Sequence, residues 1–341
     1  MQQRMCFIIV GLLLLSFGIF VNALPVDAAI YVSNNGGNSV ATWPDGAAGD
    51  TTPTTNIAGG ATTLNFPQHV TADANWIYVA NTNNNSVDVF PAGGTGDISP
   101  TRSISGGLTN LNAPRGIAVD ANWIYVSNIW NNSVAVFPIN GAGNIAPTRF
   151  IQGDSTMLSL PYGVAVDANW LYVANAGTSI TVFPINGAGN IAPTRSISLS
   201  FIPSGLAVDA SWMYVTNHYG NSVDVFPING TGSIAPTRSI QGGATALNLP
   251  VACAVDASWI YVTNAAGNSI AVFPINGTGN IAPTRSIQGG ATILNAPAGI
   301  AVVAAAPNAP GAGSGYSFPL FPPVCGVPGA SFPCLFSAPA F

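Results

Sequence analysis

The chain carries a recurring apolar segment of the form W-x-Y-V-x-N, in which aromatic and β-branched residues dominate and Asn ends the run. Its five copies begin 47, 47, 42 and 47 residues apart, at Trp76, Trp123, Trp170, Trp212 and Trp259. A period of roughly 45 residues, with short β-type segments bounded by Gly, Pro and Asn, is typical of a four-stranded propeller blade. The pattern therefore predicts an all-β propeller and no helix in the repeat region.

Each repeat unit contains four predicted strands, here called A, B, C and D. In the unit that begins at Pro114 they cover residues 114–120, 123–128, 132–138 and 147–153. Asp120 begins the A to B turn and Asn140-Gly141 opens the C to D turn, where Asn and Gly tolerate positive φ. Strands A and B read as nearly continuous apolar runs, as expected where neighbouring blades cover both faces of a sheet.

The two ends of the repeat array complement each other. The first copy starts at strand B with Ile30, and the last copy, from Pro297, contains strand A alone. We therefore predict six blades of four antiparallel strands, the first combining the C-terminal strand A with the N-terminal strands B, C and D.

One residue type supports this closure. Strand A ends with Asp in the five other copies, at Asp73, Asp120, Asp167, Asp209 and Asp256, whereas the lone C-terminal copy has Val303. That copy has no A to B hairpin, so we interpret the Asp as a turn residue whose side chain accepts backbone N–H bonds. A calcium-binding ring of these carboxylates is the alternative.

Charge is scarce. Only 6% of residues are charged, against roughly 25% in ordinary soluble domains. The charged residues are seven Arg and twelve Asp, with no Lys and no Glu, and the net charge is −5. This balance excludes the clustered basic surface that nucleic-acid binding requires.

The N-terminus has the composition of an export signal, which we place at residues 1–23. Arg4 precedes an apolar run from Cys6 to Val21, and Val21-Asn22-Ala23 satisfies the small-residue rule for cleavage. Cleavage after Ala28 and an uncleaved anchor are the alternatives. The run is shorter than the roughly 20 apolar residues of a membrane span, so we expect a secreted or extracytoplasmic protein without a span once the leader is removed.

Residues 24–303 are assigned to the propeller, and residues 304–341 form an uncharged tail with eight Pro and several Phe. Proline at this density excludes a membrane helix. The tail is interpreted as a flexible linker ending in a small loop, for which Cys325 and Cys334 are the candidate disulfide pair. Docking of its apolar end onto the propeller, a partner or a surface is the alternative. Cys253 replaces an aliphatic residue of the repeat and is predicted to be buried.

Two further sets of residues recur in every complete unit. The Trp of strand B and the Phe of strand C are predicted to supply packing mass between blades. An Arg at the start of strand D is predicted to discourage edge-to-edge pairing of the outermost strand.

The pattern P-x-G-I-A-V-D, I-Y-V-x-N and N-S-V-x-V-F resembles the NHL repeat, and I-Y-V-T-N at residues 260–264 is similar to bacterial YVTN-type repeats. The resemblance covers residues 30–303 and implies a six-bladed propeller. Propellers of this kind include protein-binding and RNA-binding modules, extracellular sensor domains, and virginiamycin-lyase-like and gluconolactonase-like enzymes. The resemblance therefore does not select a function.

The copies differ mainly on one face of the predicted ring. The D to A connections and B to C loops vary there, whereas the C to D turns on the other face repeat PINGAGN or PINGTGN. A varied rim of aromatic and polar residues is typical of a binding surface. The candidate ligand-binding residues on this face are Gln68, His69, Arg115, Trp130, Tyr162, His218 and Tyr219.

The leading hypothesis is a non-enzymatic binding or scaffold module that takes a protein, peptide or glycan on this face. The alternative implied by the resemblance is a metal-dependent lyase or hydrolase that uses His69 and His218, on opposite blades. A catalytic zinc site usually has three protein ligands, and no third ligand is evident on this face, so we expect no cofactor. A structural surface or matrix protein is the third hypothesis.

Overall fold

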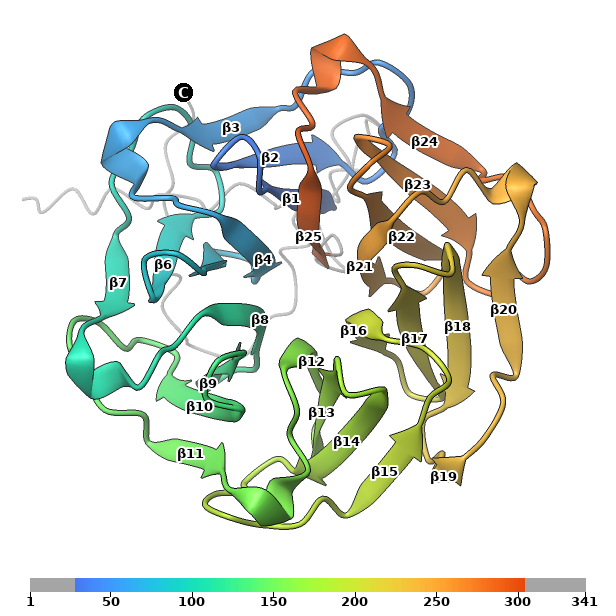
Figure 1. The fold of residues 1–341 in the computed structure, drawn as a ribbon. Coiled ribbons are helices and arrows are strands. Elements are labelled where there is room, and N and C mark those ends of the chain that lie inside the picture. Colours follow the sequence, from blue (N-terminus) through green and yellow to red (C-terminus); the bar gives the residue numbers. More distant parts are fainter. Residues whose placement is uncertain (1–27, 304–341) are drawn as a thin grey trace, which may run out of the picture. The chain divides into compact units, whose positions relative to one another are not determined.

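The computed structural model describes residues 28–303, which close into a ring of six sheets around a central channel (Figure 1). Within each sheet the strands follow the order A, B, C, D from the channel to the rim, and neighbouring strands of this series are antiparallel. The predicted six-bladed all-β propeller is confirmed.

The innermost strands are β4 (Pro67–Ala72), β8 (Pro114–Val119), β12 (Pro161–Val166), β16 (Pro203–Val208), β21 (Pro250–Val255) and β25 (Pro297–Val303). The B strands are β1 (Ala29–Asn34), β5 (Trp76–Asn81), β9 (Trp123–Asn128), β13 (Trp170–Asn175), β17 (Trp212–Asn217) and β22 (Trp259–Asn264). The C strands are β2 (Ser39–Pro44), β6 (Ser86–Pro91), β10 (Ser133–Pro138), β14 (Ser179–Pro184), β18 (Ser222–Pro227) and β23 (Ser269–Pro274). The D strands are β3 (Thr55–Ala58), β7 (Arg102–Ser105), β11 (Arg149–Gln152), β15 (Arg195–Ser198), β20 (Arg238–Gln241) and β24 (Arg285–Gln288). A two-residue strand, β19 (Gly232–Ser233), joins the sheet of blade 4.

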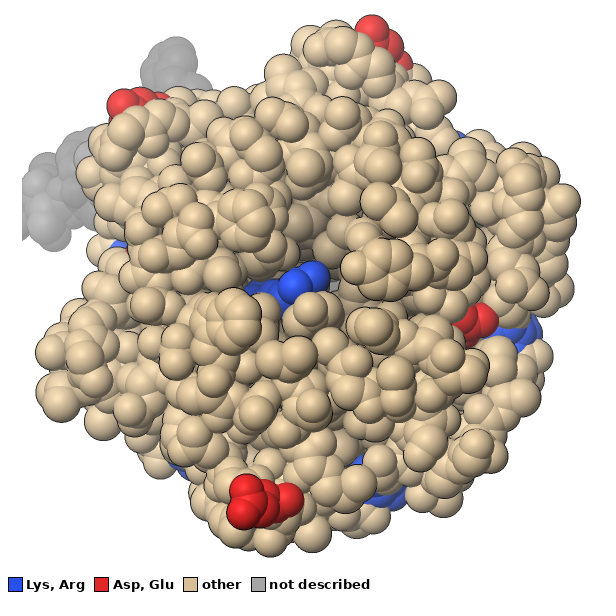
Figure 2. Space-filling view, viewed as in Figure 1, with Lys and Arg blue, Asp and Glu red and all other residues tan. Residues whose placement is uncertain are grey.

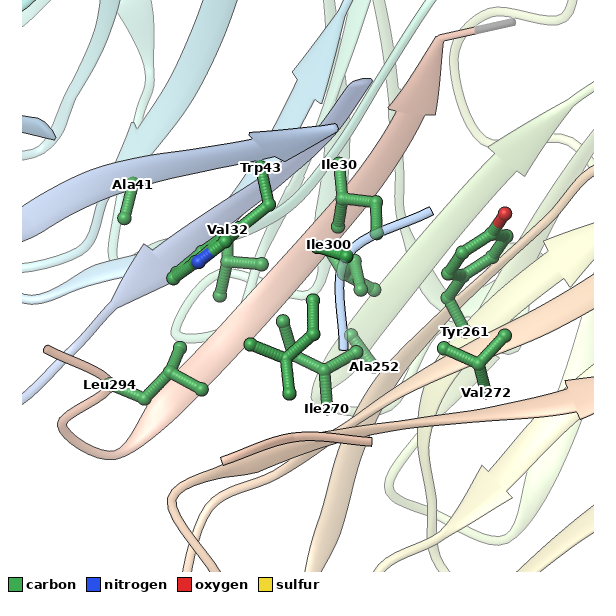
Figure 3. Close-up of a cluster of buried hydrophobic side chains, with 12 residues drawn as sticks. Ile30, Val32, Ala41, Trp43, Ala252, Tyr261, Ile270, Val272, Leu294 and Ile300 are labelled. Atoms are coloured by element: carbon green, nitrogen blue, oxygen red, sulfur yellow. The ribbon is translucent and has the colours of Figure 1, made fainter. Parts of the chain in front are cut away.

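Blade 1 is completed by strands from both ends of the described chain. β25 pairs with β1 in a register that brings Ala29 opposite Val303, where the other blades have an A to B hairpin. Behind this pair, a buried cluster joins blade 1 to blade 6, with Trp43 and Ile300 facing Tyr261 and Ile270 (Figure 3). The closure inferred from the repeat ends is thus confirmed.

The repeated C to D turns join neighbouring blades at the rim. Gly143, with φ of +75°, forms a parallel bridge with Ile104 of the preceding blade. Asn144 then accepts the backbone N–H of Leu108 at 2.8 Å. Glycine adopts this φ without steric cost. The turn sequence is repeated because its Gly and Asn connect two neighbouring blades.

Five D to A connections contain a short 3-10 helix that the sequence pattern did not predict. These are η1 (Gly60–Thr62), η2 (Gly107–Thr109), η3 (Asp154–Thr156), η4 (Gly243–Thr245) and η5 (Gly290–Thr292). The 42-residue copy has no such helix between β15 and β16. The turn facing that connection has Ser233, whereas the other five turns have an Asn or Asp that accepts a backbone N–H of a 3-10 helix.

Three predicted features lie outside the described residues: the signal peptide of residues 1–23, the tail of residues 304–341, and the Cys325 and Cys334 pair. Cys253 is buried, as predicted. Within residues 28–303, no helix has the length and apolarity that crossing a membrane requires.

Candidate functional site

The five Asp residues that end the inner strands are fully engaged in local hydrogen bonds. Asp120 Oδ1 accepts the backbone N–H groups of Asn122 and Trp123 at 2.7 and 2.8 Å, and Oδ2 accepts the hydroxyl of Tyr125 at 2.7 Å. The other four copies repeat this arrangement. The interpretation as turn residues is therefore confirmed, and the geometry gives no support to a calcium ring.

The recurrent arginines stack on the recurrent tryptophans. The guanidinium of Arg149 lies 4.4 Å from the ring centroid of Trp123, and the other four pairs lie at 4.9 to 5.2 Å. Burial together with the bond to Asp120 raises the pKa of the Tyr125 hydroxyl above its usual value. These Asp, Tyr, Trp and Arg side chains form one structural unit in each of blades 2 to 6. Candidate ligand-binding residues are therefore sought on the other face of the ring.

The face that carries the D to A connections and B to C loops is called the upper face below. At the channel mouth each inner strand begins with Pro, and the next two residues differ between blades. The third residue is small in five blades, at Gly116, Gly163, Gly205, Ala252 and Gly299. A Cβ on Gly116 would lie 2.2 Å from the carbonyl oxygen of Tyr162 on the next strand, so the small residues let the inner strands approach closely.

His69 occupies this third position in blade 2 and is paired with Ala80 of β5. In the equivalent strand β8 the register shifts between Pro114 and Ile117, so Gly116 has no paired residue on β9. Both ring nitrogens are shielded from solvent and have no hydrogen-bond partner among residues 28–303. The backbone of Ile117 lies close enough to the ring to favour its charged form in part. Desolvation, with a smaller contribution from the charge of Arg115, lowers the pKa of His69 to about 4. The imidazole is therefore neutral at pH 7 and unsatisfied.

Arg115 is the only one of the described arginines on an inner strand, since the other five begin D strands. Figure 2 shows basic atoms inside the central opening of a face that is otherwise largely uncharged. The guanidinium lies 3.5 Å from the ring centroid of Tyr162. Burial lowers the pKa of Arg115, and the groups that favour its charge are the phenols of Tyr162 and Tyr219, with no carboxylate among them.

His218 and Tyr219 extend the site from the B to C loop of blade 5. Their rings meet edge to face at 4.9 Å between centroids. His218 Nδ1 lies 3.1 Å from the carbonyl oxygen of Pro250. Because a carbonyl only accepts, Nδ1 donates and Nε2 is left as the acceptor of the neutral ring. Tyr219 is 74% exposed.

The structure thus brings four predicted residues into one group at the mouth, Arg115 with Tyr162, His69 and Tyr219, and places His218 beside the last. Trp130 lies on the B to C loop of blade 3, at the repeat position that Tyr219 has in blade 5, and is 72% exposed. Gln68 is buried, at 9% exposure.

A cavity of about 330 Å³ continues along the channel from His69, lined by the second halves of all six inner strands. Cys253 is part of this wall, and burial raises the pKa of its thiol to about 12. Within the part of the chain that the structure describes, no group of three His, Cys, Asp or Glu side chains could hold a metal ion.

Sequence reasoning missed the apolar residues that precede the inner-strand prolines. Leu160 and Ile202 are 40% and 38% exposed on the upper face. The signal was present, because the equivalent positions hold residues of very different size, from Phe66 to Ala113.

Comparison with known proteins gives a family and a fold. The family model described as "Lactonase, 7-bladed beta-propeller" matches residues 21–197. A chain in the crystal structure of a nidogen/laminin complex superposes with a TM-score of 0.59 at 16% identity, covering 81% of this chain and 98% of that chain. A functionally unknown protein from Desulfotomaculum acetoxidans gives 0.54 at 16% identity, covering 82% and 100%. No curated protein matches the sequence. At this identity the two structures support the fold alone.

Proposed function

We propose a binding function for this chain, which belongs to the lactonase, seven-bladed β-propeller family although its described residues close into six blades. The upper mouth of its channel binds a ligand through an anionic group such as a carboxylate. The protein then acts as an exported binding module, and its varied face provides the specificity.

The observation that carries this proposal is the environment of the Arg115 side chain. Its guanidinium lies over the ring of Tyr162, and the side chain is half-buried at the channel mouth with no carboxylate among the described groups that favour its charge. Partial burial of a cation without a counter-charge has a cost, whereas a carboxylate can accept two parallel N–H bonds from a guanidinium. A ligand carboxylate supplies the missing charge.

His69 adds a second polar group at the same place. A neutral imidazole has one donor and one acceptor, and neither has a hydrogen-bond partner in the described part of the chain. Leaving such groups unpaired costs about 1 to 3 kcal/mol. A ligand that carries a hydroxyl or amide beside its anionic group would pair them.

Lactone hydrolysis is the second candidate, favoured by the family match. In this reaction water attacks the ring carbonyl, the ring C–O bond breaks, and the products are a hydroxyl and a carboxylate. Arg115 would donate hydrogen bonds to the carbonyl oxygen, and His69 would accept the proton from water. A pKa of about 4 makes His69 a weak base at neutral pH, because general bases work best with a pKa near the operating pH. Binding is therefore the better supported function.

Calorimetric titration with acetate, benzoate, lactate and inorganic phosphate tests the proposal. We expect binding of at least one of these anions to be lost in Arg115→Gln and kept in Arg238→Gln, which removes an arginine from the rim. Equal affinity in wild type and Arg115→Gln would refute the anion site.

A pH-stat assay with small lactones separates the second candidate from the first. Turnover that is lost in both His69→Gln and Arg115→Gln would establish hydrolysis at this site. Anion binding without turnover leaves the protein a binding module.

A further inference from the structure

The exposed large apolar side chains of residues 28–303 lie only on the connections of the upper face. All belong to D to A connections or B to C loops: Phe66, Leu108, Trp130, Met157, Leu160, Ile202, Tyr219 and Ile293. The A to B and C to D turns of the described chain contribute none. Apolar groups gathered in this way usually mark an interaction surface.

A continuous track runs over the junction of blades 3 and 4. Asn132, two residues after Trp130, accepts the backbone N–H of Leu160 at 2.7 Å, so the loop that carries Trp130 lies directly beside Leu160. Towards the rim, Met157 precedes Leu160 on the same connection and is 56% exposed. A hollow of about 460 Å³ at the outer end is lined by Asn131, Asn132, Gln152, Gly153, Asp154 and Leu158.

The inner end of this track is the anion site. Tyr162 follows Leu160 by two residues and stacks on Arg115. Along the track the side chains are therefore amide and carboxyl at the rim, then Met, Trp and Leu, and finally Tyr and Arg at the channel mouth. Trp, Tyr, Met and Arg are the residue types that protein interfaces favour, and Lys and Glu are depleted there.

We propose that this track binds a peptide with a free C-terminal carboxylate, which pairs with Arg115, and with bulky apolar side chains behind it. The proposal rests on the anion site proposed above and adds the class of ligand. One cation at the end of an apolar track matches a chain terminus, which carries one negative charge next to a run of side chains. The track leads from the open rim into the channel mouth, so a chain that follows it inwards ends there.

Only part of the upper face contributes. Blade 4 has the shortest B to C loop, Ala176 to Thr178, between the loops with Trp130 in blade 3 and Tyr219 in blade 5. Trp130 and Tyr219 occupy the same position of the repeat in their blades and lie on either side of this short loop. We expect the peptide to pass beside Trp130 and its last residues to reach Tyr219.

The test uses fluorescent hexapeptides with Leu, Phe or Trp at the last three positions, each made with a free carboxylate and as the amide. Fluorescence anisotropy should detect the free acids and at least an order of magnitude weaker binding of the amides. Arg115→Gln should remove the difference between acid and amide. Trp130→Ser and Leu160→Ser should weaken acid peptides about tenfold while acetate binding stays unchanged.

Ile293→Ser is the matched control, because it removes an exposed apolar residue of the upper face outside the track. Equal binding of acids and amides, or an equal effect of Ile293→Ser, would overturn the peptide assignment. Binding of oligouronates in place of all the peptides would also overturn it and leave the anion site standing. If the wild-type protein binds neither the peptides nor the small anions, both proposals are refuted.

Discussion

Acidification from pH 7 to pH 5 should destabilise the propeller through His69. Its pKa is lowered from 6.5 to about 4 in the folded protein, so folding favours the neutral ring. A lowered folded pKa means that the stabilising contribution is present above the unfolded pKa of about 6.5 and is lost as pH falls towards 4. With these two values the loss amounts to about 2 kcal/mol at pH 5 and about 3 kcal/mol at pH 4.

Urea unfolding at pH 7 and pH 5 checks this magnitude in the wild type and in His69→Gln. The variant keeps a polar side chain but cannot take up a proton, so it should lose about 2 kcal/mol less than the wild type between the two pH values. The aspartates contribute equally to both proteins and cancel in the comparison. The chain has only two His, so NMR titration can assign His69 by comparison with His218→Gln. A His69 pKa near 6.5, or the same pH dependence in both proteins, would refute the reasoning.

Three further predictions concern the frame around the site. Asp120→Ala removes an acceptor of two backbone N–H bonds and one hydroxyl bond, so chemical denaturation should show a loss of about 2 to 3 kcal/mol, whereas a loss below 0.5 kcal/mol would contradict the turn role. Arg149→Gln removes the cation from the Trp123 ring and should cost about 1 kcal/mol with a change in tryptophan fluorescence; an unchanged emission spectrum would count against the stack. Burial raises the pKa of Asp88, so its contribution is present below about pH 3.8 and is lost as pH rises through the folded pKa. The gain in stability from pH 4 to pH 6 should therefore be larger in Asp88→Ala than in the wild type, and a smaller gain would show that the sign is wrong.

The number of blades and their closure were predictable because they depend on the order of strands along the chain. Val303 in place of Asp was enough to identify the missing hairpin, and the structure pairs it with Ala29. The partners of the repeated side chains were harder to predict, since they come from different strands. The sequence nevertheless contains the signal, because blade 1 lacks three members of the set together and keeps only the Tyr. Ala29 stands where the other blades have Trp, Thr55 where they have Arg, and Val303 where they have Asp.

Candidate site residues were predictable only as a list of varied positions. Sequence variation selected Arg115, Tyr162 and Tyr219, but the contact between Arg115 and Tyr162 depends on the curvature of the ring and on the close approach of the inner strands. The alignment of the repeats could have distinguished His69 from the rest, because four other copies have Gly and one has Ala at this position. The exposed track of Met157 and Leu160 was missed because aliphatic residues in a loop next to a proline suggest packing, and their exposure depends on how the connections lie across the blades.

The positions that break the repeat rules point to the same place. The repeated Asp and Tyr side chains pair with each other in blades 2 to 6, and a departure from the repeat costs stability unless something else compensates. His69 puts an unsatisfied imidazole where four blades have glycine, and Arg115 is a cation on an inner strand with no carboxylate among the described groups that favour its charge. Trp130 exposes an indole where four of the other blades have Asn, Ala or Gly. The first two lie at the channel mouth, and the third lies on the track that leads to it. Stability alone gives no reason to keep all three, whereas a ligand with an anionic end and an apolar body would compensate each of them. This agreement between three independent departures is the main reason to look for the ligand at blades 2 to 5 of the upper face.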